Sequence, residues 1–423
     1  MKNSIVSVSL WGEEICKLEW RGGYKQHFGK LGSVVSFSQK YGNLPWDLDP
    51  LGPFSKSYFF VSNGGSDWCR ATEYEGIPRF LSTSLPDDWG NAVFSAWAAE
   101  NNLKHSDITA VEKLAFIGKR GMGALEFVPS LYKADAKDEY VLEELFAVAE
   151  EIRKQRESLS LDIKSNPGIN DLMAVGMSAG GKHPKAIVAI NWQSGEIKSG
   201  QVSLPGQFIH YVLKFRDSDI WPTGDVEYAY YLMARKAGII MTPSRLISIS
   251  GLNHFLTERF DRVKGEKLHV ATLNSLAGPT SSYESAFRVA RGLNLSYNDI
   301  EQLYRRMIFN YLSGVCDDHD KNISFIMDKA GNWCLAPAYD ETFTVNISNP
   351  FIGDRHAMTV RGLERGLSKD DFLRFAEEND IRSAAGILKE VSEAATSFPE
   401  IAESLKLPSP VVEIILKHIH QIL

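Results

Sequence analysis

Short alternating runs of hydrophobic and polar residues fill about the first 60 positions, and this period of two predicts β-strands. Helical spacing follows at 87–117, where Asp87-Asp88 is placed to cap the first of two short helices. A charge-rich stretch at 133–164 has a helical pattern at 138–156. We expect this stretch to connect an N-terminal module to the rest of the chain.

The middle of the chain is predicted to be mostly β-structure. Two apolar runs, at 171–177 and 186–192, flank a Gly-rich loop and predict two strands, and 210–215 predicts a third. The pattern at 224–238 is that of a helix ending at Gly238. The segment 254–262 is again typical of a strand.

After about residue 280 the pattern becomes helical. The segment 298–316 carries an apolar stripe at helical spacing, which indicates a buried helix face rather than a chemical site. A hairpin with its turn at 328–332 follows, and 369–423 is typical of amphipathic helices. The stripe consists of Ile300, Leu303, Tyr304, Met307, Ile308, Tyr311 and Leu312.

These patterns predict an α+β protein in four segments. We expect an α/β N-terminal module at 1–132, a helical connection at 133–165, a β-rich lobe at 166–265 and a mainly helical lobe at 266–423. A length of 423 residues suits roughly two to three domains. A hydrophobic fraction of 44% is ordinary for a soluble globular protein.

Charge and cysteine content narrow the function classes. A net charge of -7 argues against a protein that binds nucleic acid by broad phosphate neutralisation. The four cysteines are scattered, without a C-x-x-C pair, which is typical of reduced thiols in the cytoplasm. The N-terminus alternates like a strand pair rather than a signal peptide, and no apolar run approaches the roughly 20 residues that cross a bilayer. We therefore expect a cytoplasmic protein without a membrane partner.

The densest polar segment is 316–322, CDDHDKN, between the predicted buried helix and the hairpin. Asp317 and Asn322 are five positions apart, and Asp340 follows the hairpin. Protein kinases use this spacing for a catalytic Asp, a Mg²⁺-binding Asn and a second Mg²⁺-binding Asp. Mg²⁺ prefers oxygen ligands, which these side chains provide. Asp318 and Asp320 do not fit the spacing, so Asp317 is the predicted base.

Two other interpretations of this segment stay open. Short Asp, His and Asn clusters are common in solvated turns. A metal-dependent phosphohydrolase could be built on His319 and Asp320, but it would need further histidine ligands. The nearest upstream histidines, His254 and His269, lie in strand-like or loop sequence, which favours the kinase-like interpretation.

A second candidate is the Gly-rich loop SAGGKHPKA at 178–186. Gly180 and Gly181 would let backbone N–H groups approach an anion, and Lys182 and Lys185 add positive charge. The alternative is a plain glycine turn. We interpret GKRGMG at 118–123 as such a turn, because no strand lysine and helix glutamate follow it in register.

Lys214, on a predicted strand after the Gly-rich loop, favours a phosphate-binding role for that loop. A lysine within an apolar strand is costly unless it is paired, and Glu227 on the next helix is the expected partner. A strand Lys paired with a helix Glu is the arrangement that holds ATP phosphates in kinases. The alternative is an edge-strand lysine that faces water. The order of loop, Lys, Glu, catalytic loop and final Asp supports phosphoryl transfer more than any single motif does.

These motifs together resemble a specific family, the HipA toxin kinases of bacterial type II toxin–antitoxin systems. The resemblance is carried by SAGGKHPKA, YVLKF, VEYAYYLMARKAGI, ERFDR, DDHDKNISF and APAYD. PRFLSTSLPDDWGN and EKLAFIGKRGMGALEFVP in addition resemble the smaller N-terminal module of full-length HipA. The resemblance therefore covers nearly the whole chain.

The resemblance implies a two-lobed Ser/Thr protein-kinase-like fold that uses ATP and Mg²⁺. Asp317 matches the catalytic Asp, and Asn322 and Asp340 match the magnesium ligands. Lys214 matches the lysine on the ATP phosphates, with Glu227 as its supporting partner. The residues that it implies for ATP binding are Ser178, Ala179, Gly180, Gly181, Lys182, His183, Lys185, Lys214, Glu258, Phe260, His319 and Tyr339.

Within that set, some positions have particular roles in the family. Glu258 and Phe260 match the interlobe hinge whose backbone meets adenine, and His319 matches a residue beside the phosphates. Ser178 matches a serine that such kinases autophosphorylate. A phosphate there, with a charge of about -1.5 to -2, would repel ATP phosphates from the loop.

The resemblance also implies partners: a HipB-like helix-turn-helix antitoxin, DNA contacted only through that antitoxin, and a protein substrate such as an aminoacyl-tRNA synthetase. The chain departs from the family at Asp318, where Gly is frequent, and at Asp320, where a small residue is frequent. The second hypothesis is therefore a kinase-fold protein that binds nucleotide or antitoxin without phosphorylating a target.

Overall fold

The computed structural model consists of two compact units, which we describe separately. The first unit combines Met1–Asp217, Glu258–Ala271 and Ile326–Asn332. The second combines Ser218–Thr257, Thr272–Phe325 and Trp333–Leu423. The structure describes residues 5–21, 32–57, 66–70, 73–103, 108–131, 139–158, 169–176, 181–202, 204–218, 220–349 and 351–420.

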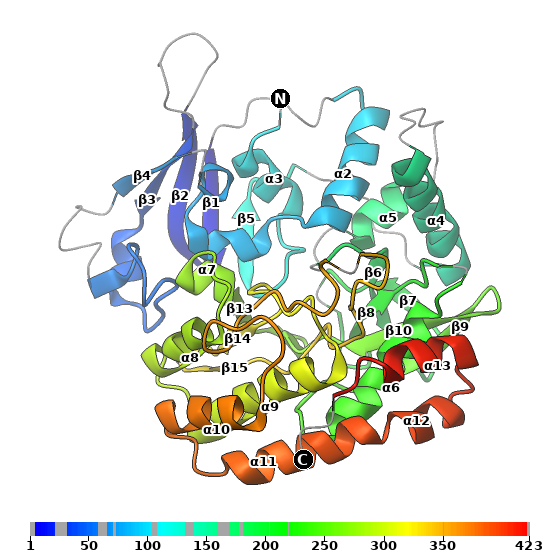
Figure 1. The fold of residues 1–423 in the computed structure, drawn as a ribbon. Helices are drawn as coiled ribbons and strands as arrows, with labels where there is room; N and C mark the ends of the chain where they lie inside the picture. Colours follow the sequence, from blue (N-terminus) through cyan, green and yellow to red (C-terminus); the bar gives the residue numbers. More distant parts are fainter. Residues whose placement is uncertain are drawn as a thin grey trace. The chain divides into compact units, whose positions relative to one another are not determined.

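The first unit begins with an antiparallel five-stranded sheet, coloured blue to cyan in Figure 1. Its strand order is β4-β3-β2-β1-β5. Val6, Val8 and Leu10 of β1 are fully buried whereas the side chains between them are less so, which confirms the predicted alternation. The strands are β1 (Ile5–Leu10), β2 (Glu13–Arg21), β3 (Gly32–Phe37), β4 (Ser66–Arg70) and β5 (Leu125–Val128).

The first of three short 3-10 helices, η1 (Gln39–Asn43), lies between β3 and β4 in sequence. The other two, η2 (Tyr74–Gly76) and η3 (Arg79–Ser84), lie between β4 and the first long helix. The helices α2 (Asp88–Glu100), α3 (Ala110–Ile117) and α4 (Leu142–Ser158) follow. Asp87 caps α2 as predicted, because its Oδ1 accepts from the Gly90 N–H at 2.7 Å. Thr109 and Glu112 form a reciprocal capping box on α3.

The predicted strand at 171–177 is wrong, since the structure has the helix α5 (Ile169–Gly176) there. Leu172 and Val175 are both fully buried, at the i, i+3 spacing of one helix face. A Cβ at Gly176 would lie 3.6 Å from a Val93 methyl group, so α5 and α2 are in ordinary packing contact there. Periodicity alone cannot separate helix from strand in so short an apolar run, and packing against α2 decided the outcome.

The predicted strands at 186–192 and 210–215 are confirmed as β6 (Lys185–Ile190) and β8 (Ile209–Lys214). They pair antiparallel, with Lys185 opposite Lys214, and β7 (Ile197–Ser199) pairs with the other edge of β6. All residues of β6 are buried, which explains its continuous apolar run.

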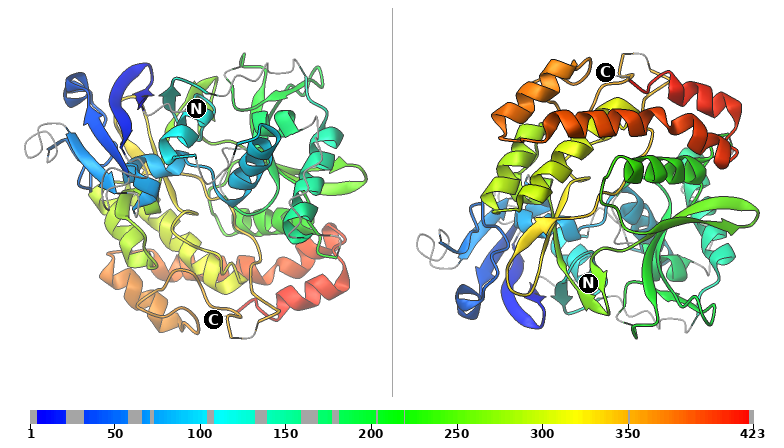
Figure 2. Two further views of the ribbon diagram at one scale, coloured as in Figure 1. Left: turned by 90° about the horizontal axis from the view of Figure 1, so that it is seen from above. Right: turned by 90° about the horizontal axis from the view of Figure 1, so that it is seen from below.

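The second unit is mainly helical. The predicted stripe on α9 (Tyr297–Ser313) is buried along its length, from Ile300 to Leu312, and is confirmed as core. α11 packs along α9, as the right-hand view of Figure 2 shows. The other helices are α6 (Thr223–Lys236), α7 (Leu273–Ala277), α8 (Tyr283–Gly292), α10 (Lys369–Glu378), α11 (Ala384–Thr396), α12 (Phe398–Ser404) and α13 (Ser409–Leu416).

The remaining strands are short. The hairpin predicted around 328–332 is confirmed by β14 (Ser324–Met327) and β15 (Trp333–Leu335), with the Asp328 N–H bonded to the Asn332 carbonyl at 3.1 Å. The strand predicted over 254–262 is interrupted, because β10 ends at Glu258. The other strands are β9 (Ser244–Ile249), β10 (Leu252–Glu258), β11 (Arg262–Val263), β12 (Glu266–Lys267) and β13 (His269–Thr272).

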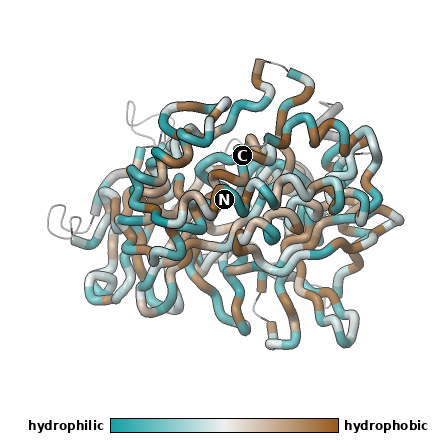
Figure 3. Tube along the Cα trace, turned by 60° about the horizontal axis from the view of Figure 1, so that its bottom comes forward, coloured by the Kyte–Doolittle hydropathy of each residue, from teal (hydrophilic) through white to brown (hydrophobic). Residues whose placement is uncertain are grey.

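Figure 3 shows hydrophobic and hydrophilic residues interspersed along the coloured part of the trace. Among the residues that the structure describes, no helix is both long enough and apolar enough to cross a membrane.

Candidate functional site

The polar segment 316–322 begins where α9 ends. Gly314 has a φ of 69°, and a Cβ there would come within 2.9 Å of a Val345 methyl group. Only glycine fits this close left-handed turn without strain. At this turn the chain leaves the buried helix and enters the loop that precedes β14.

The five-residue spacing of Asp317 and Asn322 closes the loop. Asn322 Nδ2 donates to the Asp317 carbonyl at 2.9 Å, and the Asn322 N–H donates to the His319 carbonyl at 2.9 Å. The Asp317 N–H donates to Thr344 Oγ1 at 2.9 Å. An amide that donates from its nitrogen keeps its oxygen as an acceptor, the atom that a hard cation prefers.

The three aspartates of the loop separate into two kinds. Asp317 is half-buried, whereas Asp318 and Asp320 are 3% and 8% exposed. Asp318 accepts hydrogen bonds from Tyr283 Oη at 2.8 Å and from the backbone N–H groups of Ala357 and Met358 at 2.9 and 3.3 Å.

Asp320 is held in the same manner. It accepts from Asn274 Nδ2 and from the Thr280 N–H, both at 2.9 Å. Buried carboxylates surrounded by donors hold the chain in place. Asp318 and Asp320, which departed from the family pattern, thus tie the loop to α7, α8 and the segment after β15.

Asn322 and Asp340 are brought together by the structure. Both line a small cavity of about 10 Å³, roughly the space of one water molecule. Asp340 has a φ of 58°, an uncommon conformation that Asp tolerates better than most residues. Tyr339, before it, shares a 2.6 Å hydrogen bond with Ser324 Oγ and donates to the Lys321 carbonyl at 2.7 Å.

Sequence reasoning missed the inner wall of this cavity. Arg306 donates to the Ala336 carbonyl at 2.6 Å, and Glu341 is 6% exposed. Burial raises the pKa of Glu341 to about 8, although the Arg306 guanidinium opposes that shift. Burial lowers the pKa of Arg306 to about 10. The signal in the sequence was the polar side chains on the buried side of α9, Gln302, Arg306 and Asn310.

His319 is half-buried, and its Nδ1 has no hydrogen-bond partner among the described residues. Its predicted place beside phosphates stays a prediction. Among the described residues, no group of three His, Cys, Asp or Glu side chains is arranged for a metal ion. His254 is fully buried in β10, with Nε2 3.3 Å from the Ile249 carbonyl.

The Gly-rich loop belongs to the first unit. Ser178, Ala179 and Gly180 lie outside the described residues. Gly181 has a φ of 109°, and its carbonyl accepts from the Trp89 N–H at 3.3 Å. The loop end therefore rests on the first turn of α2.

The charged residues after Gly181 differ in exposure. Lys182 is exposed, and the exposed His183 pairs through Nδ1 with Asp217. Lys185 is 1% exposed, with Nζ 3.7 Å from Asp87. The structure thus gives Lys185 an internal ion pair, whereas Lys182 is exposed and its predicted contact with phosphates stays a prediction.

The other predicted nucleotide residues divide between the units. Lys214 ends β8 in the first unit, where Glu258 Oε1 accepts from Tyr211 Oη at 3.4 Å and Phe260 is half-buried. Glu227 is 8% exposed on α6 in the second unit. The Lys214–Glu227 pair stays a prediction.

Comparison with known proteins agrees with this architecture. The family model of the HipA-like C-terminal domain matches residues 177–399, and that of the HipA N-terminal domain matches 52–128. The chain belongs to the HipA family, which confirms the resemblance seen in its motifs.

Two curated relatives are similar in sequence. A putative kinase of Haemophilus influenzae is 26% identical over 279 residues, which cover 57% of this chain and 79% of the relative. The putative kinase Y4dM of Sinorhizobium fredii is 24% identical over 237 residues, which cover 50% of this chain and 57% of the relative.

A solved structure extends the likeness to nearly the whole chain. HipA in the Shewanella oneidensis complex of HipA, HipB and operator DNA superposes with a TM-score of 0.64 at 14% identity. The match covers 98% of this chain and 94% of the other. The α+β, kinase-like fold expected from the sequence is confirmed.

Proposed function

We propose that this chain is an ATP- and Mg²⁺-dependent serine/threonine protein kinase that acts as the toxin of a HipA/HipB-like toxin–antitoxin system. The observation that carries the proposal is the closed loop of Asp317 and Asn322, with Asn322 and Asp340 on one cavity. The names of the two sequence relatives, both putative kinases, support the same reaction class.

The donor set suits the proposed metal. Asn322 and Asp340 offer an amide and a carboxylate oxygen, and Mg²⁺ is commonly held by one or two such groups together with substrate phosphates. When bound, Mg²⁺ neutralises charge that develops on the transferred phosphoryl group. In this proposal Asp317 accepts the proton of the substrate hydroxyl, because the loop presents it half-buried.

The first unit would bind the nucleotide. The loop from Ser178 to Lys182, with His183 and Lys185 following it, is proposed to cover the phosphates, and Lys214 to neutralise them. Glu258 and Phe260 mark the backbone that would meet adenine. His319 and Tyr339 complete the proposed set, and Ser178 is the proposed site of autophosphorylation.

Partners follow from the fold relative. The Shewanella oneidensis structure contains HipA, HipB and operator DNA. We propose a HipB-like helix-turn-helix antitoxin for this chain, with DNA contacted through it, in accord with a net charge of -7. The proposed substrate is a translation component such as an aminoacyl-tRNA synthetase, and the proposed location is the cytoplasm.

The alternative, a kinase-fold protein that binds nucleotide or antitoxin without phosphorylating a target, began with the unusual Asp318 and Asp320. Their oxygens accept hydrogen bonds from Tyr283, Asn274 and backbone N–H groups. Asp318 also lines the cavity of Asn322 and Asp340, so measured phosphate transfer has to decide between the two proposals.

The test is peptide mass spectrometry after incubation of the purified protein with Mg²⁺-ATP. We expect one added phosphoryl group on the peptide that carries Ser178, and none in Asp317→Asn. Asp370→Asn, an exposed carboxylate on α10, is the matched control and should behave as wild type. Bound ATP without any phosphate transfer, to itself or to an added candidate substrate, would favour the binding-protein alternative.

A further inference from the structure

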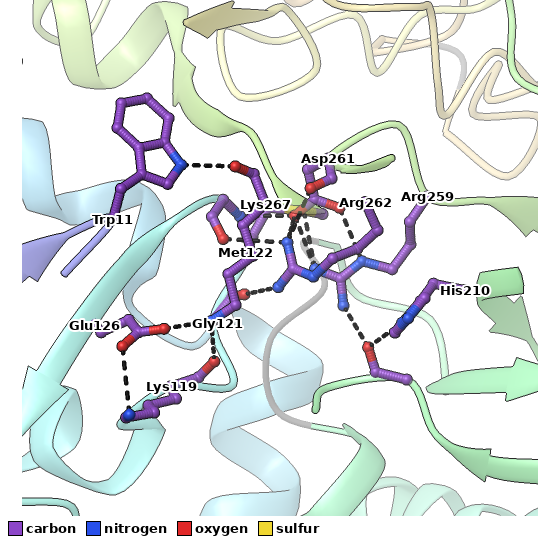
Figure 4. Close-up of polar contacts among 12 residues, drawn as sticks. Trp11, Lys119, Gly121, Met122, Glu126, His210, Arg259, Asp261, Arg262 and Lys267 are labelled. Carbon is purple, nitrogen blue, oxygen red and sulfur yellow. Dashed lines mark hydrogen bonds and ion pairs between the residues drawn. The ribbon is translucent and has the colours of Figure 1, made fainter. Parts of the chain in front are cut away.

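A buried ion cluster directly follows β10, in the segment ERFDR (Figure 4). Arg259 donates from Nε and Nη2 to the two carboxylate oxygens of Asp261, at 2.9 and 2.8 Å. Arg262 Nη1 donates to the same carboxylate at 2.7 Å. The side chains of Arg259, Asp261 and Arg262 are only 1%, 1% and 3% exposed. Such a paired geometry fixes orientation as well as charge.

The cluster binds the loop at 118–123, which sequence analysis treated as a plain turn. The Gly123 N–H donates to Asp261 Oδ2 at 2.7 Å. Arg262 donates to the carbonyls of Gly121 at 3.0 Å and Gly123 at 3.1 Å. Gly123 has a φ of 76°, and a Cβ there would lie 2.9 Å from the Val270 backbone nitrogen. Gly123 thus lets this loop approach the backbone of Val270 closely.

A second connection lies beside the first. Lys267 Nζ donates to the Lys119 carbonyl at 2.7 Å and to Glu126 at 2.9 Å, and the Lys267 carbonyl accepts from Trp11 Nε1 at 2.7 Å. Gly121, Gly123, Lys119 and Glu126 all fall within residues 52–128, the HipA N-terminal domain. The segment after β10 is therefore attached to that domain at several points.

The opposite side of the segment is fixed to the β-strands around β8. The Arg259 N–H donates to the His210 carbonyl at 2.8 Å, and Arg259 Nη1 donates to the Gly200 carbonyl at 3.2 Å. Glu258 and Phe260, on either side of the buried Arg259, are half-buried. In extended backbone, neighbouring side chains point to opposite faces. Arg259 thus anchors the segment while its two neighbours remain partly accessible.

The charges of the cluster support a rigid anchor. Burial favours the neutral form of Asp261, but the Arg259 and Arg262 guanidinium groups and the Gly123 N–H outweigh it and hold its pKa well below the usual range. Burial, and then repulsion from Arg259, lower the pKa of Arg262 to about 10. Asp261 and Arg262 are therefore charged near neutral pH, so their ion pair persists under ordinary conditions.

We infer that Arg259, Asp261 and Arg262 are positioning residues for base recognition, through which the HipA N-terminal domain sets the selectivity of the nucleotide site for adenine. The inference rests on the proposed function, which assigns adenine to the backbone at Glu258 and Phe260. Selective contact with a purine edge needs backbone donors and acceptors held to within about 0.5 Å. The cluster holds that backbone from both sides, through Gly121 and Gly123 on one side and Gly200 and His210 on the other.

The test measures dissociation constants of the full-length protein for Mg²⁺-ATP, Mg²⁺-GTP and Mg²⁺-tripolyphosphate. The main variant is Arg262→Lys, which keeps the charge beside Asp261 but cannot bridge the Gly121 and Gly123 carbonyls as a guanidinium does. Lys267→Met removes the two Nζ contacts of the second connection, keeps the backbone contact with Trp11 and is the milder variant. Glu266→Gln is the matched control, since it breaks an exposed ion pair with Lys329 in the same segment. Circular dichroism checks that each variant is folded.

In Arg262→Lys we expect ATP binding to weaken about 10-fold, while tripolyphosphate binding changes less than about two-fold and the preference for ATP over GTP falls. Lys267→Met should lower the ATP affinity and the preference for ATP over GTP by smaller factors. If Arg262→Lys does not fold, the Lys267→Met measurements test the inference.

Three results would overturn the inference. One is a folded Arg262→Lys and Lys267→Met pair with unchanged ATP and GTP affinities. Another is an equal loss of affinity for ATP and for tripolyphosphate, since a merely structural role of the cluster would weaken the binding of both ligands alike. The last is a wild-type protein that binds none of the three ligands, which would overturn the proposed function as well.

Discussion

Two buried polar clusters hold the two segments on which the proposed chemistry depends, and they do so by different means. In the second unit, Asp318 and Asp320 accept from a tyrosine, an asparagine and backbone N–H groups, and His356 Nδ1 lies 3.2 Å from Asp318 Oδ2. In the first unit, Asp261 is held by two guanidinium groups. A carboxylate with mostly neutral donors can lose its charge with a moderate loss of stability. Removal of the Asp261 charge, in contrast, leaves two buried cations without a counter-charge.

The largest expected effect tests whether Asp317 differs from its neighbours in the loop. Asp317→Asn should reduce phosphoryl transfer about 10²–10⁴-fold, because replacement of a general base has that cost. Its melting temperature should stay near that of wild type, since Asp317 is half-buried. Steady-state kinetics and thermal melting check this, with Asp370→Asn as the control. An equally active Asp317→Asn would remove the residue from the mechanism.

The next effect is on stability in the first unit. Asp261→Asn should lower the free energy of unfolding by about 3–5 kcal/mol, because it leaves Arg259 and Arg262 buried without a counter-charge. Urea denaturation followed by tryptophan fluorescence gives the value. A loss below about 1 kcal/mol would show that the arginines find water or another acceptor, and the contrast between the clusters would fail.

A smaller effect is expected for the matching change in the second unit. Asp318→Asn should lower the free energy of unfolding by about 1.5–3 kcal/mol, since the Tyr283 hydroxyl, the Ala357 N–H and His356 Nδ1 at 3.2 Å lose a charged partner, but no buried guanidinium loses its counter-charge. The same urea titration measures it. A loss larger than that of Asp261→Asn would reverse the order of the two clusters.

The pH dependence of stability sharpens the description of the first unit. Burial lowers the pKa of His269 to about 3, against about 6.5 in an unfolded chain. Between these pH values His269 is protonated in the unfolded chain but neutral in the folded protein. The free energy of unfolding therefore falls as pH decreases from about 6.5 toward 3. The slope from this group is at most about 1.4 kcal/mol per pH unit.

His269→Gln should flatten that slope in urea titrations at several pH values, whereas His418→Gln, near the C-terminus, should leave it unchanged. An equal slope in wild type and His269→Gln would mean that His269 is protonated in the folded protein or that other groups dominate the window.

The smallest effect belongs to the surface of the same segment. Glu266→Gln should change stability by less than about 1 kcal/mol, because its ion pair with Lys329 is more than half exposed on both sides. Thermal melting at low and high salt measures it. A larger, salt-dependent loss would show that the segment after β10 depends on surface charge as well as on the buried cluster.

Much of the site could be predicted from the sequence because its signals are local. Asp317 and Asn322 are joined by a hydrogen bond within their own loop, and Asp340 follows one hairpin later. The α9 stripe and the Asp87 cap depend on spacings of a few residues. The roles assigned to Ser178, Lys214 and Glu227 remain predictions, since they depend on a bound nucleotide.

The sequence by itself therefore determined the family, the α+β class, the order of the motifs and the residue in the loop that fits a catalytic base. Only the tertiary structure decided that 171–177 is a helix, that Lys185 is buried beside Asp87, and that Asp318 and Asp320 hold the chain. It also joined Gly123 to Asp261, 138 positions apart. The physical reason is that period and capping act between near neighbours, whereas the partner of a buried charge is chosen by packing between distant segments.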